Sequence, residues 1–218
     1  MKSDRRTLAL TIRRDGSVVA RAPRRAREAD VLTWVADHAD WIVRKQHAVV
    51  RLQRSAPPLR YVEGESHLYL GQSHRLAIAH GAVEGVRLAG DRIQVTVSGA
   101  ATPERVKELM DDWYARQARE QFADRLDACW AAFPPAHGGP PALRVRRMRT
   151  RWGSMSPRRS MSLRLDLIRA PVECIDYVIF HELCHLVHPN HQRAFWALVE
   201  EVVPDWKRRK RRLELILA

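Results

Sequence analysis

The sequence has few cysteines and no long apolar run. Three of its 218 residues are cysteine, and none belongs to a Cys-x-x-Cys pair, which excludes the disulfide framework of small secreted domains. No apolar stretch approaches the roughly 18 residues of a membrane span, so we expect no transmembrane segment. The charged start, KSDRR at residues 2–6, is not followed by the apolar block of a secretion signal. We therefore expect a cytoplasmic protein.

Acidic residues are scarce relative to basic ones. The chain has 25 Asp and Glu against 38 Lys and Arg, a formal net charge of +13, and this excess favours a polyanionic partner. The densest basic cluster lies in an expected terminal helix and consists of Lys207, Arg208, Arg209, Lys210, Arg211 and Arg212. Two hypotheses stay open: these side chains solvate an exposed helix face, or they bind the phosphates of DNA or RNA.

The most informative segment of the sequence is His-Glu-Leu-Cys-His at residues 181–185. On a helix, residues four apart stand about 6 Å apart along the axis, so His181 and His185 can both reach one metal ion. Glu182 points about 100° away from His181, where a carboxylate can act as a general base without ligating the metal. This spacing is typical of zinc hydrolases, and we expect Zn²⁺ as the cofactor.

A catalytic zinc site requires a third protein ligand. His188 shares the helix face but lies about 10.5 Å from His181 along the axis, too far for one ion on a straight helix. Pro189 disfavours helical geometry at His188, so the helix should end near there and the chain should turn. We therefore predict His191 as the third ligand and His188 as a residue at the rim of the site.

The opposite face of this expected helix is apolar. Val172, Ile175, Ile179, Leu183 and Leu186 cluster on it, which predicts that it packs against a core while the histidines face a site. Cys184, which lies within the motif, is interpreted as a small packed side chain beside the site.

The first half of the chain predicts short strands and one helix. Residues 8–12 and 18–21 flank an Asp-Gly turn and predict a β-hairpin. Helical spacing of apolar residues follows over 27–51. Residues 61–78 and 83–97 predict short strands separated by glycines, which complete a small sheet.

The second half predicts an α+β arrangement. A long helix is expected from the cap Thr102 and from Pro103 towards Phe133, followed by a loop over 134–141 in which His137 is interpreted as exposed. Residues 142–153 and 161–168 predict two strands before the zinc helix. We expect an α+β fold with a β-rich N-terminal region over 1–100 and a zincin-like catalytic region over 101–218, made of a helix, a β-hairpin, the zinc helix and C-terminal helices.

These residues resemble the YgjP-like metallopeptidases, with the SprT and Spartan proteases as more distant relatives. The resemblance rests on residues 177–186, on Asn190-His191 and Phe195-Trp196, on Arg-Trp-Gly-Ser at 151–154 and Ser-Leu at 162–163, and on residues 10–16 and 41–42. It implies that His181, His185 and His191 bind zinc and that Glu182 is catalytic. Met155 stands where the family usually has cysteine, and Arg164 where it usually has asparagine; both changes concern the strands near the substrate rather than the metal.

The expected function is zinc-dependent hydrolysis of peptide bonds. An exposed strand beside the metal commonly pairs with an extended peptide, and residues 144–153 are the candidate, with Arg151, Trp152 and Gly153 as substrate-binding residues. Two alternatives are kept. One is a UTP pyrophosphatase, an activity also described for YgjP-like proteins, although three imidazoles suit zinc and no glycine-rich phosphate loop is visible. The other is a nucleic-acid-associated protein with a structural metal site. Nothing in the sequence indicates an oligomeric state.

Overall fold

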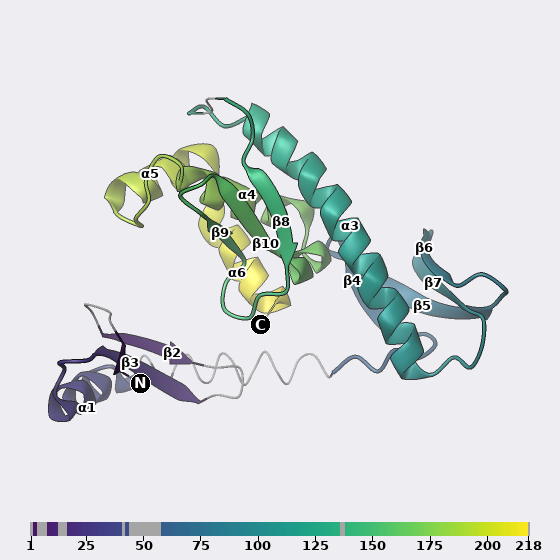
Figure 1. The fold of residues 1–218 in the computed structure, drawn as a ribbon, viewed down its shortest axis with the longest axis horizontal. Helices are drawn as coiled ribbons and strands as arrows, with labels where there is room; N and C mark the ends of the chain where they lie inside the picture. The colour runs from purple at the N-terminus through teal and green to yellow at the C-terminus, as the bar shows by residue number, and fades with distance from the viewer. Residues whose placement is uncertain are drawn as a thin grey trace. The chain divides into compact units, whose positions relative to one another are not determined.

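The computed structural model describes residues 2–3, 8–12, 17–40, 42–43, 58–135 and 138–217. These residues form helices and several separate sheets, which confirms the predicted α+β class (Figure 1). The chain forms two compact units, over residues 1–58 and 59–217. Within the described ranges, no helix combines the length and apolar character needed to cross a membrane.

The first unit contains a small sheet and one helix. Strand β2 (Ala9–Ile12) pairs antiparallel with β3 (Val18–Pro23), with Leu10 opposite Ala20, and β1 (Lys2–Ser3) pairs with β3 in parallel. The two strands of the predicted hairpin are thus confirmed, while its turn lies outside the described residues. Helix α1 covers Glu28–Asp37. The rest of the helix predicted over 27–51 falls largely on Trp41 and residues 44–51, which are also outside the described residues.

The second unit begins with a four-stranded sheet. Its strands are β4 (Ser66–Tyr69), β5 (Gln72–His80), β6 (Gly85–Ala89) and β7 (Arg92–Val97), in the order β4-β5-β7-β6. Strands β5 and β7 are parallel, with Leu76 opposite Ile93, and the other pairs are antiparallel. Alternate residues of β7, Ile93, Val95 and Val97, are fully buried. The strands predicted within 61–78 and 83–97 are confirmed.

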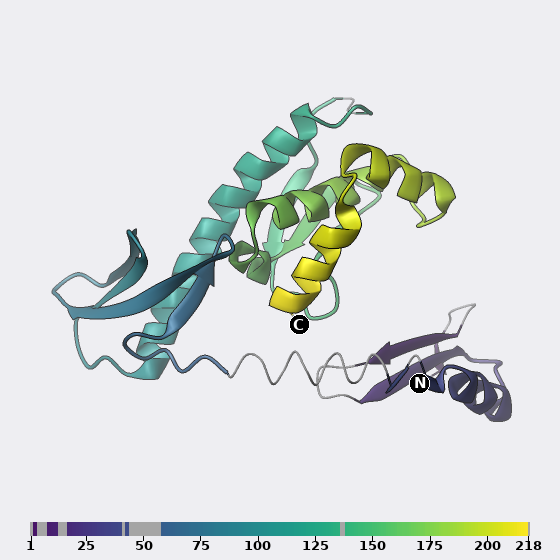
Figure 2. The same ribbon diagram turned by 180° about the vertical axis from the view of Figure 1, so that it is seen from behind.

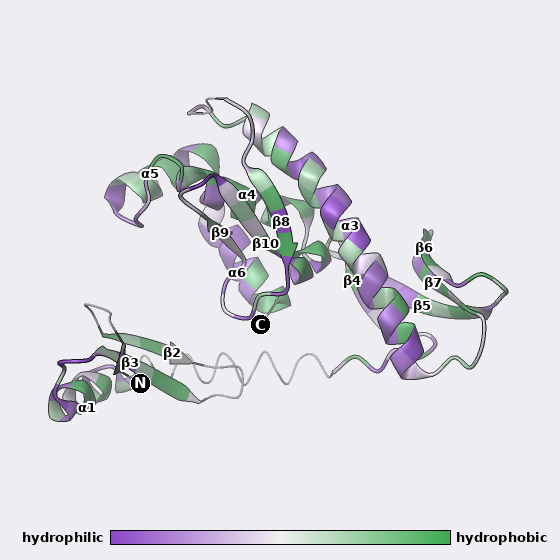
Figure 3. Ribbon diagram, viewed as in Figure 1, coloured by the Kyte–Doolittle hydropathy of each residue, from purple (hydrophilic) through white to green (hydrophobic). Residues whose placement is uncertain are grey.

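Helix α3 (Pro103–Ala131) connects this sheet to the rest of the unit. Its start is as predicted: the Thr102 hydroxyl oxygen accepts a hydrogen bond from the backbone N–H of Arg105 at 3.3 Å, and proline occupies the first turn. Apolar and polar residues alternate along the helix (Figure 3). Its buried residues are Val106, Met110, Trp113, Tyr114, Ala118, Phe122, Leu126 and Cys129. In the loop that follows, His137 lies outside the described residues.

The prediction of a single strand over 142–153 was wrong, because this segment contains two strands. The chain forms β8 (Ala142–Arg146) and β9 (Gly153–Met155), on opposite sides of β10 (Ser160–Arg164). Strand β8 is parallel to β10 and β9 is antiparallel to it. One continuous strand cannot pair with both sides of a neighbour, so the chain leaves the sheet over 147–152. The strand predicted over 161–168 is also shorter, because it turns into the 3-10 helix η1 (Leu165–Arg169).

Three helices complete the unit: α4 (Val172–Cys184), α5 (Arg193–Val202) and α6 (Trp206–Ile216). The predicted apolar face of α4 is confirmed at Ile175, Ile179 and Leu183, which are fully buried. Helices α4 and α6 lie side by side (Figure 2), and Leu213 anchors α6 in the core. The three cysteines are buried free thiols, so the expected absence of a disulfide framework agrees with the structure.

The four-stranded sheet is tied directly to the segment before α4. At the β4–β5 turn, the backbone N–H groups of Leu70 and Gly71 donate to the carbonyls of Ile168 and Arg169 at 2.8 and 3.2 Å. Gly71 has φ +79°, and a Cβ there would lie 2.6 Å from a side-chain carbon of Pro171, so only glycine fits. The predicted boundary between residues 100 and 101 falls inside this unit, because the sheet and the later helices share one core.

Candidate metal centre

The end of helix α4 presents the histidine pair. Helix α4 ends at Cys184, earlier than the predicted end near His188, because the last turn tightens: the N–H groups of His185 and Leu186 donate to the carbonyls three residues before them, at 3.2 and 2.9 Å. His185 still has helical angles, φ −68° and ψ −15°. The four-residue spacing therefore keeps both imidazoles on one side of the helix.

Three histidines converge at this point. Single donor atoms of His181, His185 and His191 all lie within 4.8 Å of one another. The Nε2 atoms of His181 and His191 are 3.0 Å apart. His191 comes from the segment between α4 and α5, as the prediction of a turn after Pro189 required. Three ring nitrogens aimed at one point fit a tetrahedral metal ion with three imidazole ligands.

Hydrogen bonding and burial give the rings the form that binds a metal. His185 Nδ1 lies 3.1 Å from the carbonyl oxygen of His188, which can only accept, so Nδ1 carries the proton and Nε2 keeps its lone pair. Burial, with smaller contributions from His185 and His191, lowers the pKa of His181 to about 3. Burial also lowers the pKa of His191. The side chain of His188 does not belong to the cluster; its backbone carbonyl orients His185.

Glu182 is a buried carboxyl group beside this cluster. Glu182 is only 4% exposed. This burial raises its pKa to about 7, although a hydrogen bond from the Met155 backbone N–H and the positive charge of Arg151 both act to lower it. Its Oε2 has no hydrogen-bond partner among the described residues. A buried, half-satisfied carboxyl with a pKa near neutrality is suited to accept and return a proton.

Strand β9 lies against Glu182. A Cβ on Gly153 would lie 2.6 Å from Glu182 Oε1, closer than two such atoms approach, so glycine leaves room for the carboxylate. The carbonyl of Trp152 and the N–H of Ser156 both bond towards β10. By alternation, the backbone groups of Gly153 and Met155 point to the outer edge of the sheet. Apart from the Met155 N–H, which donates to Glu182, these edge groups are available beside the carboxylate.

Of the three predicted substrate-binding residues, two lie near Glu182 and one packs into the core. Gly153 lies against the Glu182 side chain, and the charge of Arg151 lowers the pKa of Glu182. Trp152, in contrast, is half-buried and packs against the core. Arg144 belongs to β8, on the far side of β10, so the candidate substrate strand narrows from 144–153 to β9. Arg164 is buried and bonds to Asp166 at 2.9 and 2.6 Å, which gives this unusual residue an internal ion pair.

The basic cluster of α6 is largely engaged within the protein. Arg208 and Arg209 bond to Asp205, and Arg212 bonds to Glu173 at 2.6 Å. In addition, the Lys207 ammonium lies 5.4 Å from the centre of the Trp206 ring. Three of the six predicted nucleic-acid residues are thus engaged: Arg208 bonds to the residue that precedes α6, whereas Arg209, through the Glu173 carbonyl at 3.0 Å, and Arg212 link α6 to the start of α4.

An aromatic layer around the histidines had no predicted role. The ring of fully buried Phe195 lies 4.6 to 5.0 Å from all three histidine rings. The Trp196 ring lies 5.9 and 5.7 Å from those of His181 and His191. The only sequence signal was the position of Phe195 and Trp196 one turn after His191, at the start of an amphipathic helix.

A second missed feature joins α3 to α4. Arg125 donates two hydrogen bonds to Asp176, both 2.7 Å long, and Cys129 Sγ donates to the same carboxylate at 3.7 Å. Arg125 and Asp176 are 51 residues apart, and no spacing rule relates them. The pair fixes α4 just over one turn before His181.

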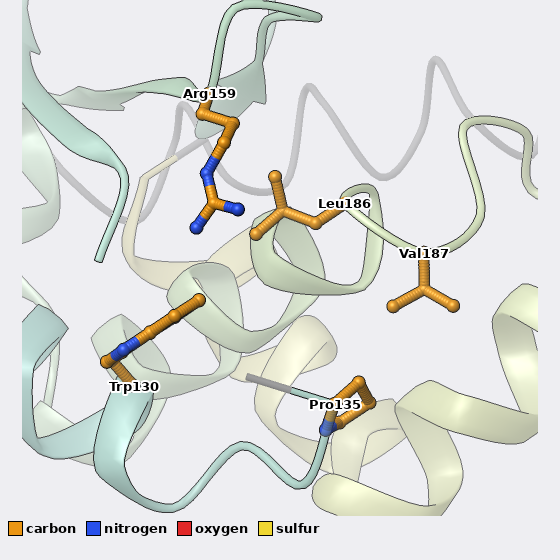
Figure 4. A pocket seen from close by; sticks show the side chains of 5 residues that line it. All are labelled: Trp130, Pro135, Arg159, Leu186 and Val187. Carbon is orange, nitrogen blue, oxygen red and sulfur yellow. The ribbon is translucent and has the colours of Figure 1, made fainter. Parts of the chain in front are cut away.

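An open pocket of about 310 Å³ lies where α4 ends. Its lining is mainly apolar and consists of Trp130, Pro135, Arg159, Leu186 and Val187 (Figure 4). The Arg159 guanidinium donates to the carbonyl of Gly139 at 2.7 Å and lies over the Trp130 ring. Leu186 and Val187 directly follow His185, so this pocket adjoins the histidine cluster along the chain.

A family model described as YgjP-like, metallopeptidase domain, matches residues 6–215. Comparison with curated proteins gives no match. Similar solved structures include the metallopeptidase zymogen abylysin of Pyrococcus abyssi, at 24% identity and a TM-score of 0.39, covering 42% of this chain and 90% of that one. They also include the zymogen jannalysin of Methanocaldococcus jannaschii, at 16% identity and a TM-score of 0.39, covering 44% and 97%.

Proposed function

The chain belongs to the YgjP-like metallopeptidase family, since the family model spans residues 6–215, and from this we propose that it is a zinc-dependent peptidase with Glu182 as its general base. The observation that carries the proposal is the convergence of three histidine donor atoms within 4.8 Å beside a buried glutamate. His181, His185 and His191 are the proposed ligands. Their donor set of neutral imidazoles is one that zinc prefers over magnesium or calcium.

Zinc, when bound, would supply a Lewis acid that polarises a carbonyl and acidifies water. The protein would supply the proton transfers. Glu182 would accept the proton of the attacking water and return it to the leaving amine, a role supported by its burial and by a pKa near neutrality. Its hydrogen bond from Met155 would hold the carboxylate at strand β9.

The proposed substrate is an extended polypeptide. The outer edge of β9 offers the N–H and carbonyl of Gly153 and the carbonyl of Met155 for pairing with a further strand, while the Met155 N–H donates to Glu182 and Gly153 leaves room for that carboxylate. Arg151, Trp152 and Gly153 remain the proposed substrate-binding residues. Of these three residues, Arg151 is the charged one, and its positive charge lowers the pKa of Glu182.

The first prediction separates ligands from base. Replacing His181, His185 or His191 by Ala should remove zinc from the purified protein, whereas Glu182→Gln should retain zinc and abolish hydrolysis, because only the imidazoles supply ligands. The matched control is His188→Ala, because its contribution is a backbone carbonyl that alanine keeps. Metal analysis and cleavage of unfolded casein are the measurements. Full zinc occupancy after His191→Ala would move the third ligand elsewhere, to His188 or to Glu200 or Glu201.

The substrate class is tested with the same proteins. Casein and UTP are each incubated with zinc and with magnesium, and Glu182-dependent cleavage of casein alone is the expected result. Magnesium-dependent release of pyrophosphate that survives Glu182→Gln would replace the peptidase by the pyrophosphatase alternative. A protein that binds zinc but cleaves neither substrate would favour a structural metal site.

A further inference from the structure

Strands β8 and β9 are joined by residues 147–152, a segment that we call the arginine loop. Alternate residues of this loop are Arg147, Arg149 and Arg151, and all three are exposed. The loop belongs to a stretch without negative charge, because residues 128–165 include eight arginines and no Asp or Glu. It therefore concentrates positive charge on the surface of the second unit.

Strand pairing places the arginine loop at the end of the sheet that lies beside Glu182. Arg146, the last residue of β8, is the partner of Arg164 on β10. The backbone N–H of Arg164 donates in turn to the carbonyl of Trp152 at 2.7 Å. Neighbouring strands are about 4.8 Å apart, so the loop crosses the end of β10 over about 10 Å. It leads directly into Gly153, where a Cβ would lie 2.6 Å from Glu182 Oε1.

A polypeptide paired with β9 would extend past this loop. Strand β9 is only three residues long, whereas an extended chain advances about 3.3 Å with each residue. Substrate residues about two to four positions beyond the one paired with Gly153 would therefore lie beside the arginine loop. These residues all lie on one side of the cleaved bond, because the loop adjoins only one end of β9.

Two of the three loop arginines are available to a ligand. Arg147 donates to Asp111 at 3.1 Å, and Asp111 also pairs with Lys107, so this arginine is held against helix α3. Within the described ranges of the chain, no carboxylate forms an ion pair with Arg149 or Arg151. Their exposed guanidinium groups can bind carboxylates from outside the chain.

We propose that the arginine loop selects polypeptide substrates with Asp or Glu on one side of the cleaved bond, and that Arg149 and Arg151 bind these carboxylates. The inference rests on the peptidase function proposed above and specifies its substrate class. Guanidinium and carboxylate groups match in charge and in bidentate geometry. An acidic peptide is favoured over nucleic acid because the loop continues the strand edge proposed to hold a peptide, and a nucleic acid bound there would cover that edge.

Cleavage of peptides tests the preference. Wild-type protein digests a library of proteome-derived peptides, and mass spectrometry identifies the cleaved bonds. Asp and Glu should be enriched about two to four positions away, on one side only. One cleaved sequence is then synthesised with Glu and, as its twin, with Gln at these positions. The Glu peptide should have a kcat/KM about fivefold higher at low salt, an advantage that falls as salt screens the exposed ion pairs.

Variants assign the preference to particular arginines. Arg149→Gln should reduce the preference for the Glu peptide from about fivefold to about twofold, and the double change with Arg151→Gln should abolish it. Arg149→Lys keeps the charge and should retain most of the preference. The matched control is Arg144→Gln, because Arg144 is exposed and belongs to β8, on the far side of β10 from the peptide edge. This control loses the same charge and should leave kcat/KM for both peptides unchanged.

Binding gives a readout that does not depend on cleavage. On the Glu182→Gln background, which prevents turnover, the zinc-loaded protein should bind the Glu peptide about fivefold more tightly than the Gln peptide. Adding Arg149→Gln should remove most of this difference, whereas adding Arg144→Gln should not. Fluorescence anisotropy measures both affinities, with a single-stranded oligothymidylate as the nucleic-acid probe.

The outcomes separate this proposal from the peptidase proposal. Wild-type protein that cleaves no polypeptide would refute the peptidase function, yet Arg149-dependent binding of the Glu peptide would still establish a site for acidic segments. Equal kcat/KM and equal affinity for the two peptides, or an equal loss in Arg149→Gln and Arg144→Gln, would overturn the role of the arginine loop. Oligothymidylate that binds through Arg149 and is not displaced by the Glu peptide would assign the loop to nucleic acid instead.

Discussion

At the scale of single residues, Glu182 combines a buried carboxyl group with a pKa raised to about 7 from an ordinary 4.5. The folded metal-free protein therefore holds this proton more tightly than the unfolded chain does. The buried Glu182 carboxyl costs no stability below pH 4.5; the cost grows between pH 4.5 and 7, where only the unfolded chain loses the proton, and is constant above pH 7. At pH 8 the difference between the two pKa values corresponds to about 3 kcal/mol.

The second prediction follows from that sign. In the metal-free protein, Glu182→Gln should unfold with a higher free energy than wild type at pH 8, by up to about 3 kcal/mol, and the gain should shrink towards pH 5. Urea unfolding at both pH values measures it, with Glu200→Gln, an exposed carboxylate on α5, as control. An advantage that is independent of pH would show that burial of charge is not its cause.

The sequence predicted the convergent residues but not what surrounds them. His181, Glu182 and His185 follow from helical spacing, and His191 follows from the effect of Pro189 on the chain. Phe195 and Trp196 approach the same point from helix α5, and their approach depends on how α5 packs against α4. Residue spacing within one element cannot predict a contact that tertiary packing creates.

At the scale of elements, the pair Arg125–Asp176 holds α3 against α4. Its geometry is bidentate, and the Asp176 side chain is 15% exposed, so removing the guanidinium leaves a poorly solvated carboxylate. The pair thus couples the position of the metal-binding helix to the long helix behind it.

The third prediction concerns this junction. Arg125→Met should lower the free energy of unfolding by about 1 to 2 kcal/mol and Arg125→Lys by less, because lysine keeps the charge but not the fork. Arg119→Met, on an exposed position of the same helix, should change it little. Urea unfolding measures the differences. Equal effects at residues 119 and 125 would mean that the ion pair does not stabilise the junction.

Strand boundaries show what the sequence leaves undetermined at this scale. Residues 142–153 have a strand-like composition throughout, so composition predicted one strand. The break at 147–152 exists because β8 and β9 pair with opposite sides of β10, an arrangement set by long-range pairing. The caps of α3 are local, and the Thr102-Pro103 start was predicted correctly.

The basic cluster of α6 is a related case. The sequence predicted the helix but not its partner on α4, because Glu173 lies 39 residues from Arg212 and becomes its neighbour only in the folded chain. Binding of DNA or RNA through these residues stays a prediction. With three arginines already paired to carboxylates, fewer charges are available for phosphates than the composition suggests.

At the scale of the whole molecule, the second unit has one core. The predicted division at residues 100 and 101 would separate the four-stranded sheet from α3, although Tyr69, Ile93 and Val95 share a cluster with residues of α3 and α4. The β4–β5 turn is also bonded to η1. Cutting there would expose apolar surface on both sides.

The fourth prediction tests this cooperativity. A chain of residues 59–218 should fold, bind zinc and unfold in a single transition, whereas residues 101–218 should bind no zinc stoichiometrically and should lack a cooperative transition. Thermal unfolding followed by circular dichroism, with metal analysis, gives both readouts. Stoichiometric zinc in a folded 101–218 fragment would instead support the division at 100 and 101.

The contact between Gly153 and Glu182 has a consequence for how related chains are judged. Under the proposed mechanism, a chain that keeps all three histidines and the glutamate would still lose catalysis if any side chain replaced this glycine, because a Cβ would occupy the place of the carboxylate. Such a chain would be a pseudoenzyme with an intact signature motif. We therefore expect the residue at position 153, 28 residues before His181, to distinguish active from inactive relatives as well as the histidines do.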